Sequence, residues 1–224
     1  MYKRKEIIGD CTLYLGDCMD VIKGLDGSYD VVTDPPYGIN FKGKTRATKK
    51  DEIYAGGSYR RTHKPIIGDN KEFDPTFLLG YKNVIMWGAN NYCKHLPNSN
   101  GWLVWHKDGG SKGFNMSECE MAFTNFLGSC KHISHMWNGF KRDSEVGEKV
   151  LHPTQKPVVV MKWCVSKLPD SSNVIIDPFL GSGATGVACA LMRKKFIGIE
   201  LDEDYFNIAC KRIEDAYRQG DLFI

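Results

Sequence analysis

The sequence predicts an α/β protein with a mostly parallel sheet and helices on both of its faces. Short apolar strands alternate with helical segments, most regularly from residue 157 onward, and such alternation is typical of parallel sheets. Acidic residues stand at the ends of four of these strands: Asp17, Asp34, Asp177 and Glu200. Because the carboxyl ends of parallel strands lie along one edge of the sheet, where open α/β sheets bind ligands, we expect the four acids to converge there.

Strands are expected wherever a short run is apolar or rich in β-branched residues. Such runs occupy residues 12–15, 30–33, 83–87, 102–105, 120–125, 132–137, 174–176 and 196–199. The run at 30–33 is continuous and apolar in its middle, which is typical of a buried strand. Pro35 and Pro36 end it, because proline supplies no hydrogen to the ladder and biases its predecessor toward extended geometry.

Helices are expected between these strands. A short helix should follow Asp17, another should follow the N-cap and proline pair Asp74-Pro75, and a third is expected at 90–96. Longer helices are predicted at 157–168 and 181–192. In the closing helix, apolar residues recur at i, i+3 and i+4 between 205 and 217, and Gly220 is expected to cap its C-terminus.

Composition indicates a globular protein of the cytoplasm. The chain has 224 residues, enough for one large α/β domain or two small ones, and 42% of them are hydrophobic, which supports a sizeable core. The formal charge is only +3, so overall charge does not indicate a nucleic-acid partner, and any basic surface has to be local. We expect no membrane segment, because no stretch approaches a span, and no signal peptide, because the N-terminal residues lack its apolar region.

Cysteine and histidine patterns do not predict a metal site. The eight cysteines include no C-x-x-C pair, as expected for free thiols in a reducing compartment. Cys130, His132 and His135 are spaced closely enough to suggest zinc ligands, but the local pattern lacks a fourth ligand.

A basic stretch follows the strand at 30–33. Between Phe41 and Pro65 there are eight Lys or Arg residues, and the acidic residues are Asp51 and Glu52, which gives a local charge of +6. Loops of this length inside a compact domain are uncommon and are usually functional or disordered. Two interpretations remain open, a solvated flexible loop and a loop that closes over a polyanion.

Asp34-Pro35-Pro36-Tyr37 forms a candidate binding motif at the predicted sheet edge. It places a carboxylate, an exposed carbonyl at Pro35 and an aromatic ring on backbone that two prolines hold rigid. Such a set can hold a planar amine, because two oxygens accept its hydrogens and the ring stacks on it. The alternative interpretation is a turn stiffened by proline.

A glycine segment suits NAD, FAD or any other cofactor that carries adenosine. Gly181, Gly183 and Gly186 fit G-x-G-x-x-G between a strand and a helix, where a ligand can approach the backbone and meet unpaired amide groups. Glu200, at the end of the next strand, can accept the hydroxyls of a ribose. Asp177-Pro178-Phe179, directly before the glycines, does not resemble a dinucleotide fingerprint.

Three motifs together resemble the signatures of a known family. Residues 34–37 (Asp-Pro-Pro-Tyr), 152–157 (His-Pro-Thr-Gln-Lys-Pro) and 177–183 (Asp-Pro-Phe-Leu-Gly-Ser-Gly) resemble those of S-adenosylmethionine-dependent amino-methyltransferases that modify DNA. The catalytic motif precedes the cofactor strand, as in the circularly permuted β-class. The resemblance covers about residues 10–218 and implies a Rossmann-like methyltransferase fold, although Ala184 stands where many relatives have threonine.

The resemblance implies methyl transfer to a base flipped out of DNA. The acceptor would be N6 of adenine or N4 of cytosine, in a short specific sequence. Asp34 and the Pro35 carbonyl would accept the amine hydrogens, Pro36 would stiffen the turn and Tyr37 would stack on the base. Aspartate at the first motif position favours adenine.

The resemblance also implies S-adenosylmethionine as the cofactor. Asp17 would contact its adenine, Glu200 its ribose, Asp177 and the glycine turn its methionine part, and Thr154 with Lys156 its carboxylate. The full expected cofactor set is Asp17, Cys18, Asp34, Thr154, Lys156, Asp177, Phe179, Gly181, Ser182, Gly183, Glu200 and Leu201.

Double-stranded DNA is the partner that the resemblance implies, with no membrane involved. We expect a single catalytic domain over 1–224, in which a basic loop at about 38–72 contacts phosphates and short loops at about 106–150 recognise the target. The expected phosphate contacts are Lys42, Lys44, Arg46, Lys49, Lys50, Arg60 and Arg61. A homodimer and a restriction endonuclease partner both stay open, and the expected location is the nucleoid of a bacterial or phage-infected cell.

Several other functions remain open at this stage. The chain could be an N4-cytosine DNA methyltransferase or a non-catalytic DNA-binding paralogue that keeps the fold. A methyltransferase for RNA or protein glutamine usually places the cofactor motif first, unlike this chain. An NAD-dependent oxidoreductase would leave residues 34–37 and 152–157 unexplained.

Overall fold

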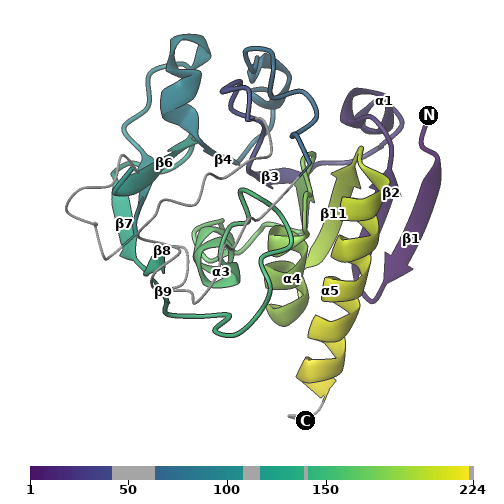
Figure 1. Cartoon of the computed structure of the whole chain (residues 1–224). Coiled ribbons are helices and arrows are strands. Elements are labelled where there is room, and N and C mark those ends of the chain that lie inside the picture. The colour runs from purple at the N-terminus through teal and green to yellow at the C-terminus, as the bar shows by residue number, and fades with distance from the viewer. Residues whose placement is uncertain (42–63, 108–116, 139–140, 222–224) are drawn as a thin grey trace.

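The computed structural model describes residues 1–41, 64–107, 117–138 and 141–221, and a nine-stranded sheet runs through them (Figure 1). The strand order is β1-β2-β11-β10-β3-β4-β6-β5-β7. These strands are β1 (Arg4–Ile8), β2 (Cys11–Leu15), β3 (Asp30–Thr33), β4 (Val84–Trp87), β5 (Trp102–His106), β6 (Cys119–Thr124), β7 (Lys131–Ser134), β10 (Val174–Asp177) and β11 (Lys195–Glu200). β8 (Trp137–Asn138) and β9 (Lys141–Arg142) form a separate hairpin.

The five central strands, from β2 to β4 in the sheet order, are all parallel. The outer strands add antiparallel pairs, β1 with β2 and β6 with both β4 and β5. From β10 the chain crosses to β11 on one side, whereas β3 leads to β4 on the other. The boundary between the neighbouring strands β10 and β3 is therefore a topological switch point, where open α/β sheets bind ligands. The predicted α/β class with a mostly parallel sheet is confirmed.

Helices cover the two faces unequally. α3 (Val158–Val165), α4 (Ala184–Leu191) and α5 (Glu203–Asp221) lie side by side over one face (Figure 1). Residues 184–190 of α4 are all buried between the sheet and its two neighbouring helices, which is why this helix is built of small residues. The other face is covered by α1 (Cys18–Ile22) and by apolar residues of short 3-10 turns, such as Leu78 and Ala89.

Some predicted element boundaries were wrong. Residues 90–96 form two 3-10 turns, Ala89–Asn91 and Cys93–His95, in place of a helix. α3 ends at Val165 instead of residue 168, and α5 runs through Gly220, so this glycine is not its C-cap. β1 and the β8–β9 hairpin were not predicted, because their charged and mixed sequences carry no alternating pattern.

No helix in the described ranges combines the length and the hydrophobicity needed to cross a membrane.

Gly101, which directly precedes β5, allows a close approach of two chain segments. A Cβ at this position would lie 2.2 Å from the carbonyl oxygen of Leu127. We expect Gly101→Ala to lower the free energy of unfolding by about 1–3 kcal/mol, because the segments must separate to admit the methyl group. Urea unfolding followed by tryptophan fluorescence measures the change. The matched control is Gly128→Ala, whose Cβ would meet no atom within 4 Å. Equal urea midpoints for the two variants would contradict the close approach at Gly101.

Candidate active site

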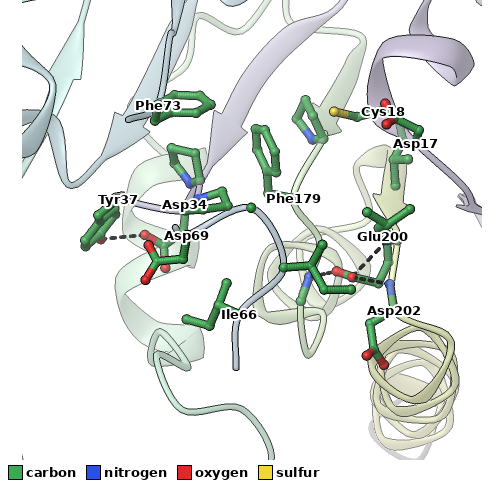
Figure 2. A pocket seen from close by; sticks show the side chains of 18 of the residues that line it. Asp17, Cys18, Asp34, Tyr37, Ile66, Asp69, Phe73, Phe179, Glu200 and Asp202 are labelled. Carbon is green, nitrogen blue, oxygen red and sulfur yellow. Dashed lines mark hydrogen bonds between the residues drawn. The ribbon is translucent and has the colours of Figure 1, made fainter. Parts of the chain in front are cut away.

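A cavity of about 670 Å³ opens at the carboxyl edge of the parallel strands. Its lining includes the residues that follow β2, β3 and β11, together with a segment at 65–69. Figure 2 shows Asp34 and Tyr37 at one end, Asp17 and Glu200 at the other, and Phe179 between them. Three of the four acids expected to converge therefore line one cavity, as the parallel pairing requires.

Asp34 and Tyr37 form one hydrogen-bonded unit. The Tyr37 hydroxyl donates to Asp34 Oδ1 at 2.6 Å (Figure 2). Burial raises the pKa of Asp34, although the nearby Lys156 ammonium opposes the rise. Burial and the Asp34 carboxylate raise the pKa of Tyr37 well above its ordinary value, so its hydroxyl keeps the proton that it donates. Both residues, with Pro35 and Pro36, line the cavity.

Lys156 lies behind Asp34 and not among the residues that line the cavity. Its Nζ is 2.6 Å from Asp34 Oδ2, 2.9 Å from the Tyr37 hydroxyl and 3.0 Å from Glu120 Oε2. The Lys156 side chain is 5% exposed, so this ion pair is shielded from water. Burial works against the ammonium, but the two carboxylates outweigh it and raise the pKa of Lys156. That Lys156 meets the carboxylate of a cofactor stays a prediction; in the structure its ammonium contacts the carboxylates of Asp34 and Glu120.

Glu120 is a site residue that the sequence did not reveal. Antiparallel pairing of β6 with β4 matches Ala122 to Trp87 and so carries Glu120 past the end of β4 toward Tyr37. Its Oε1 is 2.6 Å from Lys107 Nζ. Burial opposes the charged form, yet the ammonium groups of Lys156 and Lys107 lower the pKa of Glu120 to about 2. No sequence signal indicated this role, because a single acid near the start of a strand belongs to no motif.

Gly88 makes room for the Tyr37 ring. Its φ is +72°, in the left-handed region, and a Cβ there would lie 1.9 Å from a ring carbon of Tyr37. Only glycine fits this close approach without moving the ring.

Asp69 fixes the chain that follows Tyr37. Its carboxylate accepts hydrogen bonds from the amides of Gly38 (2.9 Å), Ile39 (3.3 Å) and Phe41 (2.7 Å). The residue is 2% exposed and lines the cavity. Sequence reasoning missed it, because Gly68-Asp69 lies in the long stretch without periodicity.

At the opposite end, Glu200 is held by backbone amides. Oε1 accepts from Leu201 (2.9 Å) and Asp202 (2.8 Å), and Oε2 accepts from Gly181 (2.7 Å) (Figure 2). Burial raises the pKa of Glu200 to about 7 despite these bonds. A carboxylate offers about four acceptor positions, so about one remains for a ligand hydroxyl.

Other expected cofactor residues line the same cavity. Asp17 caps α1 by accepting from the Met19 amide at 2.8 Å. The Thr154 hydroxyl lies 3.2 Å from His152 Nδ1, and the His152 ring packs against Tyr205. The expected residues found in the lining are Asp17, Cys18, Asp34, Thr154, Phe179, Gly181, Glu200 and Leu201.

Asp177, Ser182 and Gly183 support the glycine turn from behind instead of lining the cavity. Asp177 accepts hydrogen bonds from the hydroxyls of Thr33 and Thr185, each at 2.6 Å. Burial raises its pKa to about 6. The Ser182 carbonyl accepts from Arg212 at 2.8 Å, and the Gly183 backbone lies against Ala209.

The seven residues expected to contact phosphates, from Lys42 to Arg61, lie outside the described residues. Of the neighbouring basic side chains, Lys64 pairs with Asp204 and lies 3.5 Å from Asp202. Within the described ranges, no group of three or more His, Cys, Asp or Glu side chains has the arrangement of a metal site.

Comparison with known proteins gives a consistent set of matches. A family model described as DNA methylase matches residues 30–211. The type II methyltransferase M2.LlaDCHI of Lactococcus lactis subsp. cremoris is 28% identical over 63% of this chain and 54% of its own length. M2.DpnII of Streptococcus pneumoniae is also 28% identical, over 60% and 52%. M.HinfI of Haemophilus influenzae is 25% identical over 94% and 71%. The chain thus spans about half the length of the first two relatives.

Two solved structures share the fold. The complex of M1.HpyAVI with SAM has a TM-score of 0.52 and 23% identity, covering 90% of this chain and 99% of that one. The PvuII cytosine-N4-specific DNA methyltransferase has a TM-score of 0.58 and 12% identity, covering 98% and 96%.

The raised pKa of Asp177 predicts a specific pH dependence of stability. The folded protein binds the Asp177 proton more tightly than the unfolded chain, whose carboxyl has the ordinary pKa of 3.8. Wild-type stability therefore falls as the pH rises from about 4 to about 6, by up to about 3 kcal/mol from this group. Asp177→Asn removes the titration, so its stability should improve relative to the wild type over this interval. Urea unfolding at several pH values measures the difference. The exposed control Asp170→Asn should show no such trend, and a flat difference for Asp177→Asn would contradict the assignment.

Proposed function

The chain belongs to the DNA methylase family, and from this membership we propose that it transfers a methyl group from S-adenosylmethionine to the exocyclic amine of a base in DNA. One observation carries the proposal: the Asp34 carboxylate and the Glu200 carboxylate line opposite ends of a single cavity at the switch point of the sheet. Asp34 can therefore accept the hydrogens of a substrate amine while Glu200 accepts a ribose hydroxyl of the cofactor, and the two ligands meet in the same cavity. We further propose that residues 1–224 form one catalytic domain with the permuted order of motifs.

The Glu200 end of the cavity fits S-adenosylmethionine. Glu200 keeps about one acceptor position for a ribose hydroxyl, and Asp17 lies beside it with a further carboxylate. Phe179 and Ile66 supply apolar surface for a planar ring. Gly181 has φ +53° and no side chain to obstruct the turn. The bound cofactor would supply an electrophilic methyl group, with cleavage of its sulfur–methyl bond and S-adenosylhomocysteine as the leaving group.

The Asp34 end fits the substrate amine. An exocyclic amine conjugated to a base is a poor nucleophile. Asp34 and the Pro35 carbonyl would accept its hydrogens, favour a more tetrahedral nitrogen and so free its lone pair, and Asp34 would take up the proton lost on methylation. Positioning and electrostatics then supply most of the rate. The base has to be flipped to reach this depth, and Tyr37 would stack on it.

Adenine N6 in a short specific sequence is the favoured target, because Asp34 occupies the position where cytosine-N4 enzymes more often have serine. Cytosine N4 is the second candidate, and the fold of the PvuII enzyme accommodates that chemistry. A non-catalytic paralogue is disfavoured, because it would have no use for a carboxylate, a tyrosine and a lysine held at 2.6–2.9 Å from one another.

Double-stranded DNA is the proposed partner. The basic loop at about 38–72 would contact phosphates, and the loops at about 106–150 would read the target. As the matched relatives are bacterial type II methyltransferases, a restriction endonuclease in the same cell is a further proposed partner, with the nucleoid as the place of action. A homodimer is also compatible with this proposal.

Asp34→Asn should lower turnover by about 10²-fold or more, because the amide keeps the shape of the side chain but is a weaker acceptor for the amine and its proton. Transfer of tritium from labelled S-adenosylmethionine to unmodified genomic DNA measures the rate without knowledge of the target sequence. Asp26→Asn, an exposed acid remote from the cavity lining, is the control and should behave as the wild type. Wild-type turnover in Asp34→Asn would refute the proposed role.

Replacing Lys49, Lys50, Arg60 and Arg61 by alanine should weaken DNA binding in a salt-dependent way. Each lost phosphate contact should flatten the slope of log affinity against log salt by up to about 0.9, because fewer counterions are released. Affinity for S-adenosylmethionine and the preferred target sequence should not change, since phosphate contacts do not read bases. Fluorescence anisotropy at several salt concentrations gives the slope. An unaltered slope would show that the stretch is only a solvated loop, and an altered target preference would show that it reads bases.

A further inference from the structure

The Lys156 ammonium neutralises the carboxylate that the proposed reaction needs as an acceptor. An ammonium has three hydrogens, and three oxygens surround Nζ: Asp34 Oδ2 at 2.6 Å, the Tyr37 hydroxyl at 2.9 Å and Glu120 Oε2 at 3.0 Å. Tyr37 occupies Asp34 Oδ1 at the same time. Asp34 keeps about two further acceptor positions, but the ammonium at Oδ2 neutralises its charge, so Asp34 accepts the hydrogens of a substrate amine more strongly when Lys156 loosens its hold.

Lys156 cannot leave Asp34 without another charged partner. Its side chain is 5% exposed, and an unpaired ammonium at such a depth is strongly disfavoured. Glu120 is already in contact with Nζ, so a small shift of the ammonium exchanges one carboxylate for the other without exposing the charge.

A second ammonium stabilises the charged form of Glu120 while Lys156 shifts toward it. Its second oxygen is held by Lys107 Nζ at 2.6 Å, independently of Lys156. The four groups Asp34, Lys156, Glu120 and Lys107 together carry no net charge, and movement of Lys156 between its two acids leaves that balance unchanged.

We propose that Glu120 is a positioning residue for methyl transfer, which holds the Lys156 ammonium while Asp34 accepts the hydrogens of the substrate amine. This inference rests on the proposed function. It assigns a role to an acid on β6 that lies outside the motifs at 34–37, 152–157 and 177–183.

A first test follows the Asp34 carboxyl itself and needs no methyl transfer. Asp34 is assigned in carbon-13 spectra of carboxyl-labelled aspartate by its loss in Asp34→Asn, and is then titrated. In Glu120→Gln, Lys156 keeps only Asp34 as a charged partner, so the Asp34 midpoint should move to lower pH. The control is Glu118→Gln, an exposed acid two residues away, which should leave the midpoint in place. Other groups that act on Asp34 are the same in both variants, namely Tyr37, Tyr92, Cys164 and Asp177.

A second test uses turnover on genomic DNA in a double-mutant cycle. Glu120→Gln should lower kcat by about tenfold, in the range of couplings between contacting side chains, with unchanged cofactor affinity by calorimetry. In a Lys156→Met background, Glu120→Gln should cause no further loss, because Glu120 acts only through Lys156.

The two tests separate the possible failures. Unchanged kcat in Glu120→Gln, additive losses in the cycle or an unmoved Asp34 midpoint would each overturn the positioning role. If the Asp34 midpoint shifts in Glu120→Gln but the wild-type protein transfers no methyl group, Glu120 and Asp34 share the Lys156 charge and the proposed function is overturned instead.

Discussion

Parallel pairing of β3 with β10 is the constraint on which the rest of the site depends. It matches Ile176 to Val31, so the two strands end within one residue of each other. The hydroxyl of Thr33, the last residue of β3, then donates to Asp177, the last residue of β10, at 2.6 Å. This buried bond joins the turn that carries Asp34 to the turn that carries Gly181. A shift of one residue in this pairing would turn every side chain of one strand to the opposite face and separate the two turns.

The site holds the Asp34 and Glu200 carboxylates in different ways. Glu200 is held by three backbone amides, which are neutral and fixed by the chain itself. Asp34 is held by a hydroxyl and an ammonium, which are carried by movable side chains. A fixed amide shell suits a residue that binds the same ligand in every cycle. A shell of movable donors suits a residue whose partner must change during the reaction.

The sequence was sufficient for the features that are local. Short apolar runs predicted the central strands, and proline or glycine at their ends predicted the turns that bear Asp34 and Gly181. The contacts made by Glu120, Lys156 and Asp69 could not be predicted, because each depends on segments that are brought together only in space. Lys156 in particular was expected to face an anion near a helix start. It does face anions, but they belong to β6 and to the turn after β3. Asp177, Ser182 and Gly183 were predicted to contact the cofactor, and that stays a prediction; the structure places them behind the turn, a position that cannot be read from a motif.

Asp69 has a consequence for how the protein can evolve. By binding the amides of Gly38 and Phe41, it fixes the chain on one side of residues 42–63 to the chain on the other side. For a loop whose ends are already held together, each doubling of length costs only about 0.6 kcal/mol. Insertions and deletions between these anchors can therefore accumulate with little effect on the position of Tyr37. Changes in the length of the chain between the anchors therefore leave the Asp34–Tyr37 pair in place, because Asp69 holds the segment that directly follows Tyr37.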